Sequence, residues 1–136
     1  MHTAELTVDT GRSPGLVDLT DACRRFLDEA DADYGLLTVF VPHATAGVVV
    51  VELGAGTDAD LLSALETMLP HDDRWGHRHG SPGHGADHVL PLLVSPSLTV
   101  PVVGGRMTLG RWQSIALVDP NRDNPRRSVR LAYLAG

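Results

Sequence analysis

Short apolar runs rich in β-branched residues recur along this chain, and turn residues close most of them. Such residues favour strands, and the Gly-Gly pair at positions 104–105 is typical of a hairpin turn. Pro101 inside one run indicates an edge strand or a bulge, because proline donates no ladder hydrogen bond. Four consecutive valines at 48–51 predict a strand buried on both faces. The runs lie at residues 6–8, 36–41, 48–51, 98–103, 107–109, 112–118 and 128–134.

Two segments have the spacing of amphipathic helices. The first runs from a cap at Asp18 or Thr20 to about residue 30, and the second covers residues 60–69 and ends at Pro70. A short third helix over residues 86–93 is weakened by Pro91. The expected apolar stripes are Leu19, Cys23, Phe26 and Leu27 in the first helix and Leu61, Leu62, Leu65 and Leu69 in the second.

These elements predict an α+β fold, an antiparallel β-sandwich with two or three helices. At 136 residues and 43% hydrophobic content, we expect one domain over residues 1–136. No apolar run approaches the roughly 20 residues that a membrane-spanning helix needs, and the first residues show no signal peptide. The single cysteine, Cys23, has no internal disulfide partner and is expected in the core, so we expect a cytoplasmic protein without a membrane partner.

The charge of the chain excludes several classes of function. Its net charge of −6 argues against a nucleic-acid partner. All eleven basic residues are arginine, which excludes lysine Schiff bases and lysine-dependent phosphate-binding loops. An anion must therefore be held by arginine, by backbone amides or by a metal.

One polar stretch holds five of the seven histidines, namely His71, His77, His79, His84 and His88. Neutral imidazole is the commonest protein ligand of transition metals, and glycine and proline break this stretch into a loop. It therefore predicts a metal-binding loop, and the alternative is a scatter of surface histidines.

Two pairs within this loop have the spacing of chelating ligands. His77 and His79 face the same way if their segment is extended. His84 and His88 share one face if theirs is helical, although the glycines beside His84 favour His88 as the better ligand. A cupin would add a glutamate soon after His79, which this sequence lacks.

Three further positions outside the loop could carry chemistry. His43 lies between two strand runs, and Glu52 follows the four valines, where a carboxylate is costly unless it is paired, bound to metal or at the strand's exposed end. Arg126 and Arg127 follow a turn expected over residues 121–125 and could hold a phosphate. The alternative for the arginine pair is ordinary surface charge.

These segments occur in an order that resembles one family. The motifs that carry this resemblance are His43-Ala44-Thr45-Ala46, Glu52, Leu69-Pro70, Trp75-Gly76-His77, His88, Pro101-Val102, the block Gly105-Arg106-Met107-Thr108-Leu109-Gly110-Arg111-Trp112-Gln113, and Pro125-Arg126. The chain resembles the YjbQ-like family, described as secondary thiamine-phosphate synthases. The Leu-Gly-x-Trp-Gln block is its most specific motif.

The resemblance implies an α+β fold, a homotrimer and a pocket at or near the subunit interface that holds a divalent metal. It also implies a weak ability to join the pyrimidine and thiazole halves of thiamine phosphate. The sequence departs from the family pattern at Val51, His84, Asp87 and Ser128, around this site. The site residues carried over are His43, His77 and His88 as metal ligands, with Glu52, Arg126, Gln113 and Thr45 as catalytic residues.

Three functions are consistent with these residues. The first is metal-assisted transfer, in which a diphosphate leaving group of a phosphorylated substrate is neutralised by the metal and Arg126. The second is metal-assisted hydrolysis with Glu52 as general base, and the third is a non-enzymatic trimer that binds metal or a small ligand. Histidine nitrogens favour zinc as the metal, with magnesium as the alternative.

Overall fold

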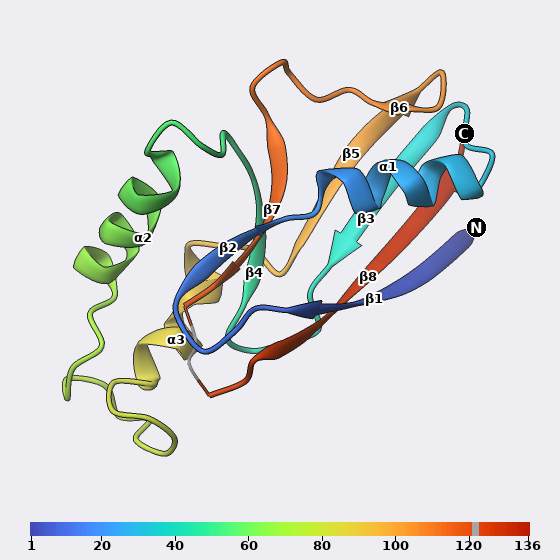
Figure 1. Ribbon diagram of the computed structural model, residues 1–136. Coiled ribbons are helices and arrows are strands. Elements are labelled where there is room, and N and C mark those ends of the chain that lie inside the picture. The colour runs from blue at the N-terminus through green and yellow to red at the C-terminus, as the bar shows by residue number, and fades with distance from the viewer. Residues whose placement is uncertain (121–122) are drawn as a thin grey trace.

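The computed structural model describes residues 1–120 and 123–136, so the first two residues of the turn expected over 121–125 lie outside the described part. The α+β prediction is confirmed (Figure 1). In chain order the described elements are β1 (His2–Asp9), β2 (Gly15–Asp18), α1 (Thr20–Glu29), β3 (Gly35–Phe40), β4 (Gly47–Val51), α2 (Thr57–Met68), α3 (Gly85–Val89), the 3₁₀ turn η1 (Leu90–Leu92), β5 (Ser97–Val103), β6 (Arg106–Met107), β7 (Ser114–Asp119) and β8 (Arg126–Ala135).

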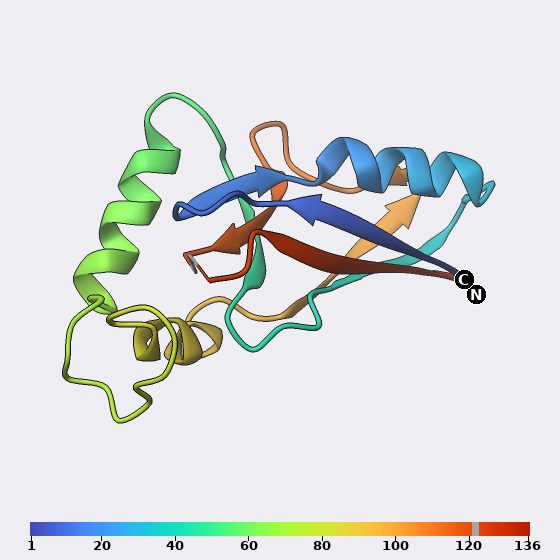
Figure 2. The same ribbon diagram turned by 60° about the horizontal axis from the view of Figure 1, so that its bottom comes forward.

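The strands form two curled sheets in which all pairs of neighbours are antiparallel over the described residues. One sheet has the order β1-β8-β3-β5-β6, and the other has the order β2-β7-β4. Helix α1 lies over the strands at one end of the molecule, while α2 and α3 lie at the other end (Figures 1 and 2). No helix among the described residues is long and apolar enough to cross a membrane.

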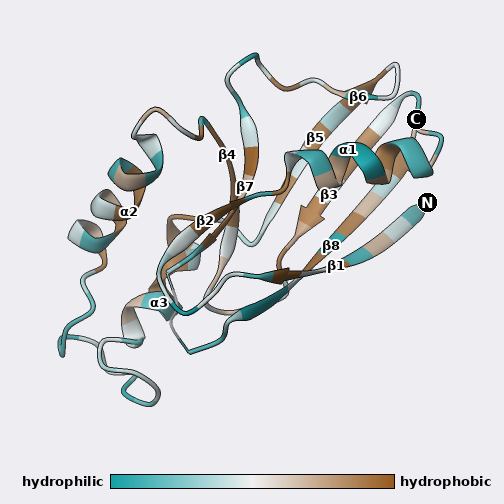
Figure 3. Ribbon diagram, viewed as in Figure 1, coloured by the Kyte–Doolittle hydropathy of each residue, from teal (hydrophilic) through white to brown (hydrophobic). Residues whose placement is uncertain are grey.

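The main core lies between α1 and the inner faces of the two sheets. Figure 3 shows α1 with its hydrophilic side turned away from the strands, as its predicted stripe requires. Strand β8 alternates as predicted, with Val129, Leu131 and Tyr133 buried. Cys23 is fully buried in this core, and burial, followed by the charge of Asp18, raises the pKa of its thiol to about 12. The thiol is therefore unreactive at neutral pH.

Several strand boundaries differ from those expected. The strand expected over residues 112–118 begins at Ser114, because Trp112 belongs to an exposed turn. The valine run is buried only at its start: Val48 is buried, whereas Val50 is 37% exposed. Burial on both faces was therefore wrong, and β4 is one of the two edge strands of its sheet. Strand β2 was not predicted, because glycine and proline before it indicated only a turn.

The expectation that Pro101 lies at an edge is consistent with its surroundings. Its carbonyl accepts hydrogen bonds from the backbone N–H and the hydroxyl of Thr108, on the side where β6 has only two residues. In an antiparallel ladder, the N–H and C=O of one residue point to the same side. The N–H that proline lacks would therefore have pointed to this short edge strand.

A buried ion pair joins the two sheets. Arg127 on β8 is 2% exposed, and its guanidinium donates two 2.9 Å hydrogen bonds to the carboxylate of Asp119 on β7. The same guanidinium donates to the hydroxyl of Thr45 at 3.0 Å, and the hydroxyl of Thr10 donates to Asp119 at 2.7 Å. Arg127 therefore has a structural role, which corrects the interpretation that it pairs with Arg126 to hold phosphate.

We expect Asp119→Ala to lower the free energy of unfolding by about 3–5 kcal/mol, because it leaves a buried guanidinium without its carboxylate. The control is Asp21→Ala, which removes the exposed 2.8 Å pair with Arg24 and should cost about 1 kcal/mol or less. Urea denaturation at one protein concentration measures both values. Equal losses in the two variants would contradict the role given to the buried pair.

Candidate metal centre

The histidine-rich loop connects α2 to α3 and is folded back on itself. Gly83 has φ +79°, and a Cβ there would overlap the backbone of His71. A Cβ on Gly85 would overlap the side chain of Trp75. The indole N–H of Trp75 donates to the carbonyl of Pro70 at 2.8 Å, and the ring packs on a small apolar cluster that includes Leu90. The two glycines thus let both arms of the loop pack together.

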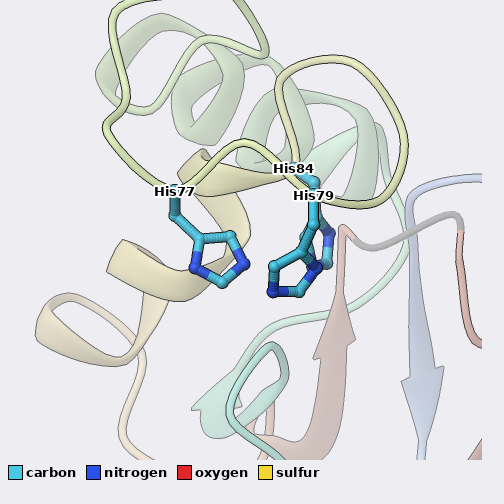
Figure 4. A group of neighbouring side chains, drawn as sticks. All are labelled: His77, His79 and His84. Atoms are coloured by element: carbon cyan, nitrogen blue, oxygen red, sulfur yellow. The ribbon is translucent and has the colours of Figure 1, made fainter.

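Three imidazoles converge beneath α3. His77, His79 and His84 each offer one ring nitrogen, and these nitrogens lie within 4.8 Å of one another (Figure 4). The rings of His77 and His79 lie 3.9 Å apart between centroids, so this predicted pair does face the same way.

A fourth imidazole adjoins these three. Nε2 of His88 lies 3.1 Å from Nε2 of His84, and the His88 ring centroid lies 3.9 Å from that of His77. His84 and His88 are one turn apart at α3, as the spacing predicted. We call His77, His79, His84 and His88 the imidazole cluster.

The cluster has the properties of a transition-metal site. Nε2 of His77 is buried and has no hydrogen-bond partner among the described residues, which is costly unless a metal or another group satisfies it. Two nitrogens bound tetrahedrally to one zinc would lie about 3.3 Å apart, close to the His84–His88 separation. Burial, followed by the charges of neighbouring histidines, lowers the pKa of His77 and of His88. Both shifts favour the neutral ring, which is the form that binds metal.

Two carboxylates lie beside the ring of His84 on its other side, within ion-pair distance but without hydrogen-bond geometry to its Nδ1. Nδ1 of His84 lies 3.2 Å from Oδ2 of Asp123 and 3.5 Å from Oδ2 of Asp87. A carboxylate beside one ring nitrogen favours the proton on that nitrogen and leaves the other as a ligand. The charge of these carboxylates therefore favours Nε2, which lies 3.1 Å from Nε2 of His88, as the ligand atom of His84.

Two further charged side chains, His71 and Glu66, lie on the side of Asp87 away from the cluster. Oδ1 of the buried Asp87 is 2.6 Å from Nε2 of His71, and Nδ1 of His71 is 2.6 Å from Oε2 of Glu66 on α2. Burial alone would lower the pKa of His71, but its hydrogen bonds to Glu66 and Asp87 outweigh this effect and raise it. Both ring nitrogens of His71 are thus engaged, and it supports the cluster from outside.

Two of the residues named from the sequence lie beside the sheet-joining ion pair. Nε2 of His43 accepts the backbone N–H of Ser128 at 2.9 Å, and burial, followed by the charge of Arg127, lowers the pKa of its ring. Thr45 binds Arg127. His43 is not in the three-histidine group, so His77 and His88 are the named ligands that the structure brings together.

The other three named residues are exposed. Glu52 directly follows β4, and Gln113 directly precedes β7, where its Oε1 accepts the backbone N–H of Gly110 at 2.8 Å. Arg126 begins β8. Within the described residues, none of them makes a hydrogen bond or ion pair with the imidazole cluster.

Sequence reasoning missed the carboxylates behind the cluster. The position of Asp87, three residues after His84, was a usable signal because residues i and i+3 share a helix face. The contacts of Asp87 with His71 and of Asp123 with His84 join distant segments, so spacing could not have revealed them.

Comparison with known proteins gives consistent matches over the chain. The sequence model of the family described as UPF0047 protein YjbQ-like matches residues 4–136. The chain is 60% identical to UPF0047 protein Rv2556c of Mycobacterium tuberculosis, with 100% of both chains covered. It is 33% identical to a UPF0047 protein of Methanothermobacter thermautotrophicus, over 97% of this chain and 91% of that one. The crystal structure of hypothetical protein APE1520 from Aeropyrum pernix K1 matches with TM-score 0.89 at 34% identity, over 100% of both chains.

The raised pKa of His71 predicts a specific pH dependence of stability. The folded state holds this proton more tightly than the unfolded chain, so the contribution is complete below about pH 6.5 and is lost as pH rises through the folded-state pKa. We expect the difference in unfolding free energy between wild type and His71→Gln, measured with chelator present, to be larger at pH 6 than at pH 9. His2→Gln, on exposed β1, is the control. A difference that grows with pH would contradict the prediction.

Proposed function

The chain belongs to the UPF0047 YjbQ-like family, and we propose that it binds one divalent transition-metal ion through the imidazole cluster. One observation carries the proposal: ring nitrogens of His77, His79 and His84 converge within 4.8 Å. The contact between Nε2 of His84 and Nε2 of His88 adds a fourth candidate ligand.

We propose zinc as the metal. The donors are neutral imidazole nitrogens, which suit zinc, whereas magnesium prefers oxygen ligands. His43 was the third ligand implied by the family resemblance. Its Nε2 already accepts a hydrogen bond from Ser128, so only Nδ1 is left for an ion. The proposed ligand set therefore takes His79 and His84 in its place.

The reaction that we propose is a weak, secondary thiamine-phosphate synthase activity on phosphorylated small molecules. The metal would supply Lewis acidity where negative charge develops on a departing diphosphate. The role of this chain's own residues is to position the imidazoles, with the hydrogen-bonded series from Glu66 through His71 to Asp87 lying beside His84. Hydrolysis with Glu52 as general base remains the alternative reaction.

We propose a homotrimer, because two of the named catalytic residues, Glu52 and Gln113, lie away from the cluster within one chain. Val51 pairs with Ser114, so Glu52 and Gln113 extend the far end of the β4–β7 ladder. Both views place that end of the ladder away from α3 (Figures 1 and 2). The family resemblance implies a pocket at or near a subunit interface, where Glu52 and Gln113 of one chain would face the cluster of the next.

Light scattering tests this assembly. We expect a mass near three times that of the 14.5 kDa chain at micromolar concentration. A mass near that of one chain would contradict the proposal.

We further propose that residues 1–136 fold as one domain that acts in the cytoplasm. The buried free thiol of Cys23 supports a reducing compartment.

We expect about one zinc ion per chain after zinc add-back and dialysis, measured by elemental analysis. His79→Ala and His84→Ala should weaken binding strongly, because each removes a ligand. Asp87→Asn should weaken it about 10- to 100-fold, because it removes the buried negative charge beside Nδ1 of His84. His2→Ala is the matched control and should bind as wild type does. No retained zinc, or equal loss in the control, would contradict the centre.

We expect any synthase activity to turn over more slowly than about 1 per second and to be lost with chelator and in His84→Ala. The measurement is a coupled assay with the two phosphorylated halves of thiamine phosphate. Retained zinc without detectable turnover would favour the non-enzymatic alternative. Activity that is unchanged by chelator would place the chemistry elsewhere.

A further inference from the structure

We propose that the groove between α1 and the 105–113 segment is a binding site for a phosphate-bearing small molecule, held by Arg24, Arg106 and Arg111. Its lining residues come from α1, β6 and the segment after β6, which lie at the end of the molecule opposite α3 (Figure 1), and none of the clustered imidazoles lines it. The groove shares Gln113 with the interface pocket proposed above, but its anion-binding residues are Arg24, Arg106 and Arg111, so the proposal does not rest on the metal ion.

The groove has the size of a ligand site. It encloses about 520 Å³, within the roughly 300–1,000 Å³ typical of small-molecule pockets. Leu27, Met107 and Leu109 give it an apolar part. A ligand with a small apolar body beside its anionic group would fit this combination.

The charge of the lining selects an anion. Three arginines line the groove, and Asp28 is the only acidic residue among its described lining residues, although Asp21 outside the groove pairs with Arg24. This local excess of positive charge stands out in a chain of net charge −6. Guanidinium is charged at every physiological pH and binds phosphate oxygens in a bidentate manner.

The polar groups are partly held in place before a ligand arrives. The guanidinium of Arg24 donates to Asp21 at 2.8 Å, and that of Arg111 lies 4.9 Å from the ring centroid of Trp112. The backbone N–H of Gln113 donates to the carbonyl of Gly110 at 3.0 Å and closes the turn. Such pre-ordering lowers the conformational entropy that these side chains lose when a ligand binds.

Gln113 contributes another donor to this site. Its Oε1 already accepts the backbone N–H of Gly110, so the amide N–H groups are what it offers to a ligand. The side-chain groups that the lining presents are therefore mostly donors, which matches the acceptor oxygens of a phosphate. The Leu-Gly-x-Trp-Gln block thereby gains a binding role beside the catalytic role that the resemblance implies for Gln113.

The test is calorimetric titration of the full chain with inorganic pyrophosphate at constant ionic strength. We expect saturable binding that Arg24→Gln weakens about tenfold, as loss of a charge-assisted hydrogen bond predicts. Arg106→Gln combined with Arg111→Gln should weaken it further. Arg25→Gln is the matched control, because it removes the same charge from the same helix at a position that does not line the groove. It should leave binding unchanged.

The same titration on His84→Ala separates this site from the metal centre. We expect pyrophosphate to bind this variant as it binds the wild type. Loss of binding in His84→Ala would assign the anion to the metal centre and overturn the proposal. Equal weakening by Arg24→Gln and Arg25→Gln would show only general charge attraction and would also overturn it, as would the absence of saturable binding to wild type.

Discussion

The ion pair between Arg127 and Asp119 is the interaction on which the arrangement of the two sheets depends. It is the point where β8 of one sheet is bonded through side chains to β7 of the other. Thr45 also binds this pair, so the loop between β3 and β4 is held at the same place, and His43 of that loop bonds to the backbone of Ser128. Because a buried charge is tolerated only when it is paired, neither sheet can shift without a large cost.

Much of the fold could be predicted from short-range patterns. The alternation of β8, the apolar face of α1 and the pairs His77–His79 and His84–His88 all follow from the period of one element. The same alternation could also have predicted the burial of Arg127. It lies two residues before Val129 on β8, so both side chains face the core. The valine run was misread because burial on both faces depends on which strands and helices lie beside it, and composition does not contain that information.

The contacts between distant segments of the candidate site could not be predicted from the sequence, for physical reasons. The spacing of each histidine pair could be predicted from the sequence. The convergence of the two pairs depends on Gly83 and Gly85, which let residues 71–77 pack against the start of α3. The outer layer depends on α2, which brings Glu66 to His71. A spacing rule describes one helix or strand, whereas these contacts join two helices through a loop whose path is set by packing.

His84 and Asp87, two positions at which the resemblance implied other residues, make physical sense as a unit. An added imidazole at His84 is a useful ligand only in the tautomer with its proton on Nδ1, and the carboxylate of Asp87 favours that tautomer. A buried carboxylate is itself costly, and burial raises the pKa of Asp87, while the hydrogen bond from His71 acts in the opposite direction. The desolvation cost of each buried polar group is thus offset by its contact with the next group in the series, which ends at the exposed Glu66. Changing one member alone would leave a buried polar group without its partner, so the side chains from His84 to Glu66 form one electrostatic unit.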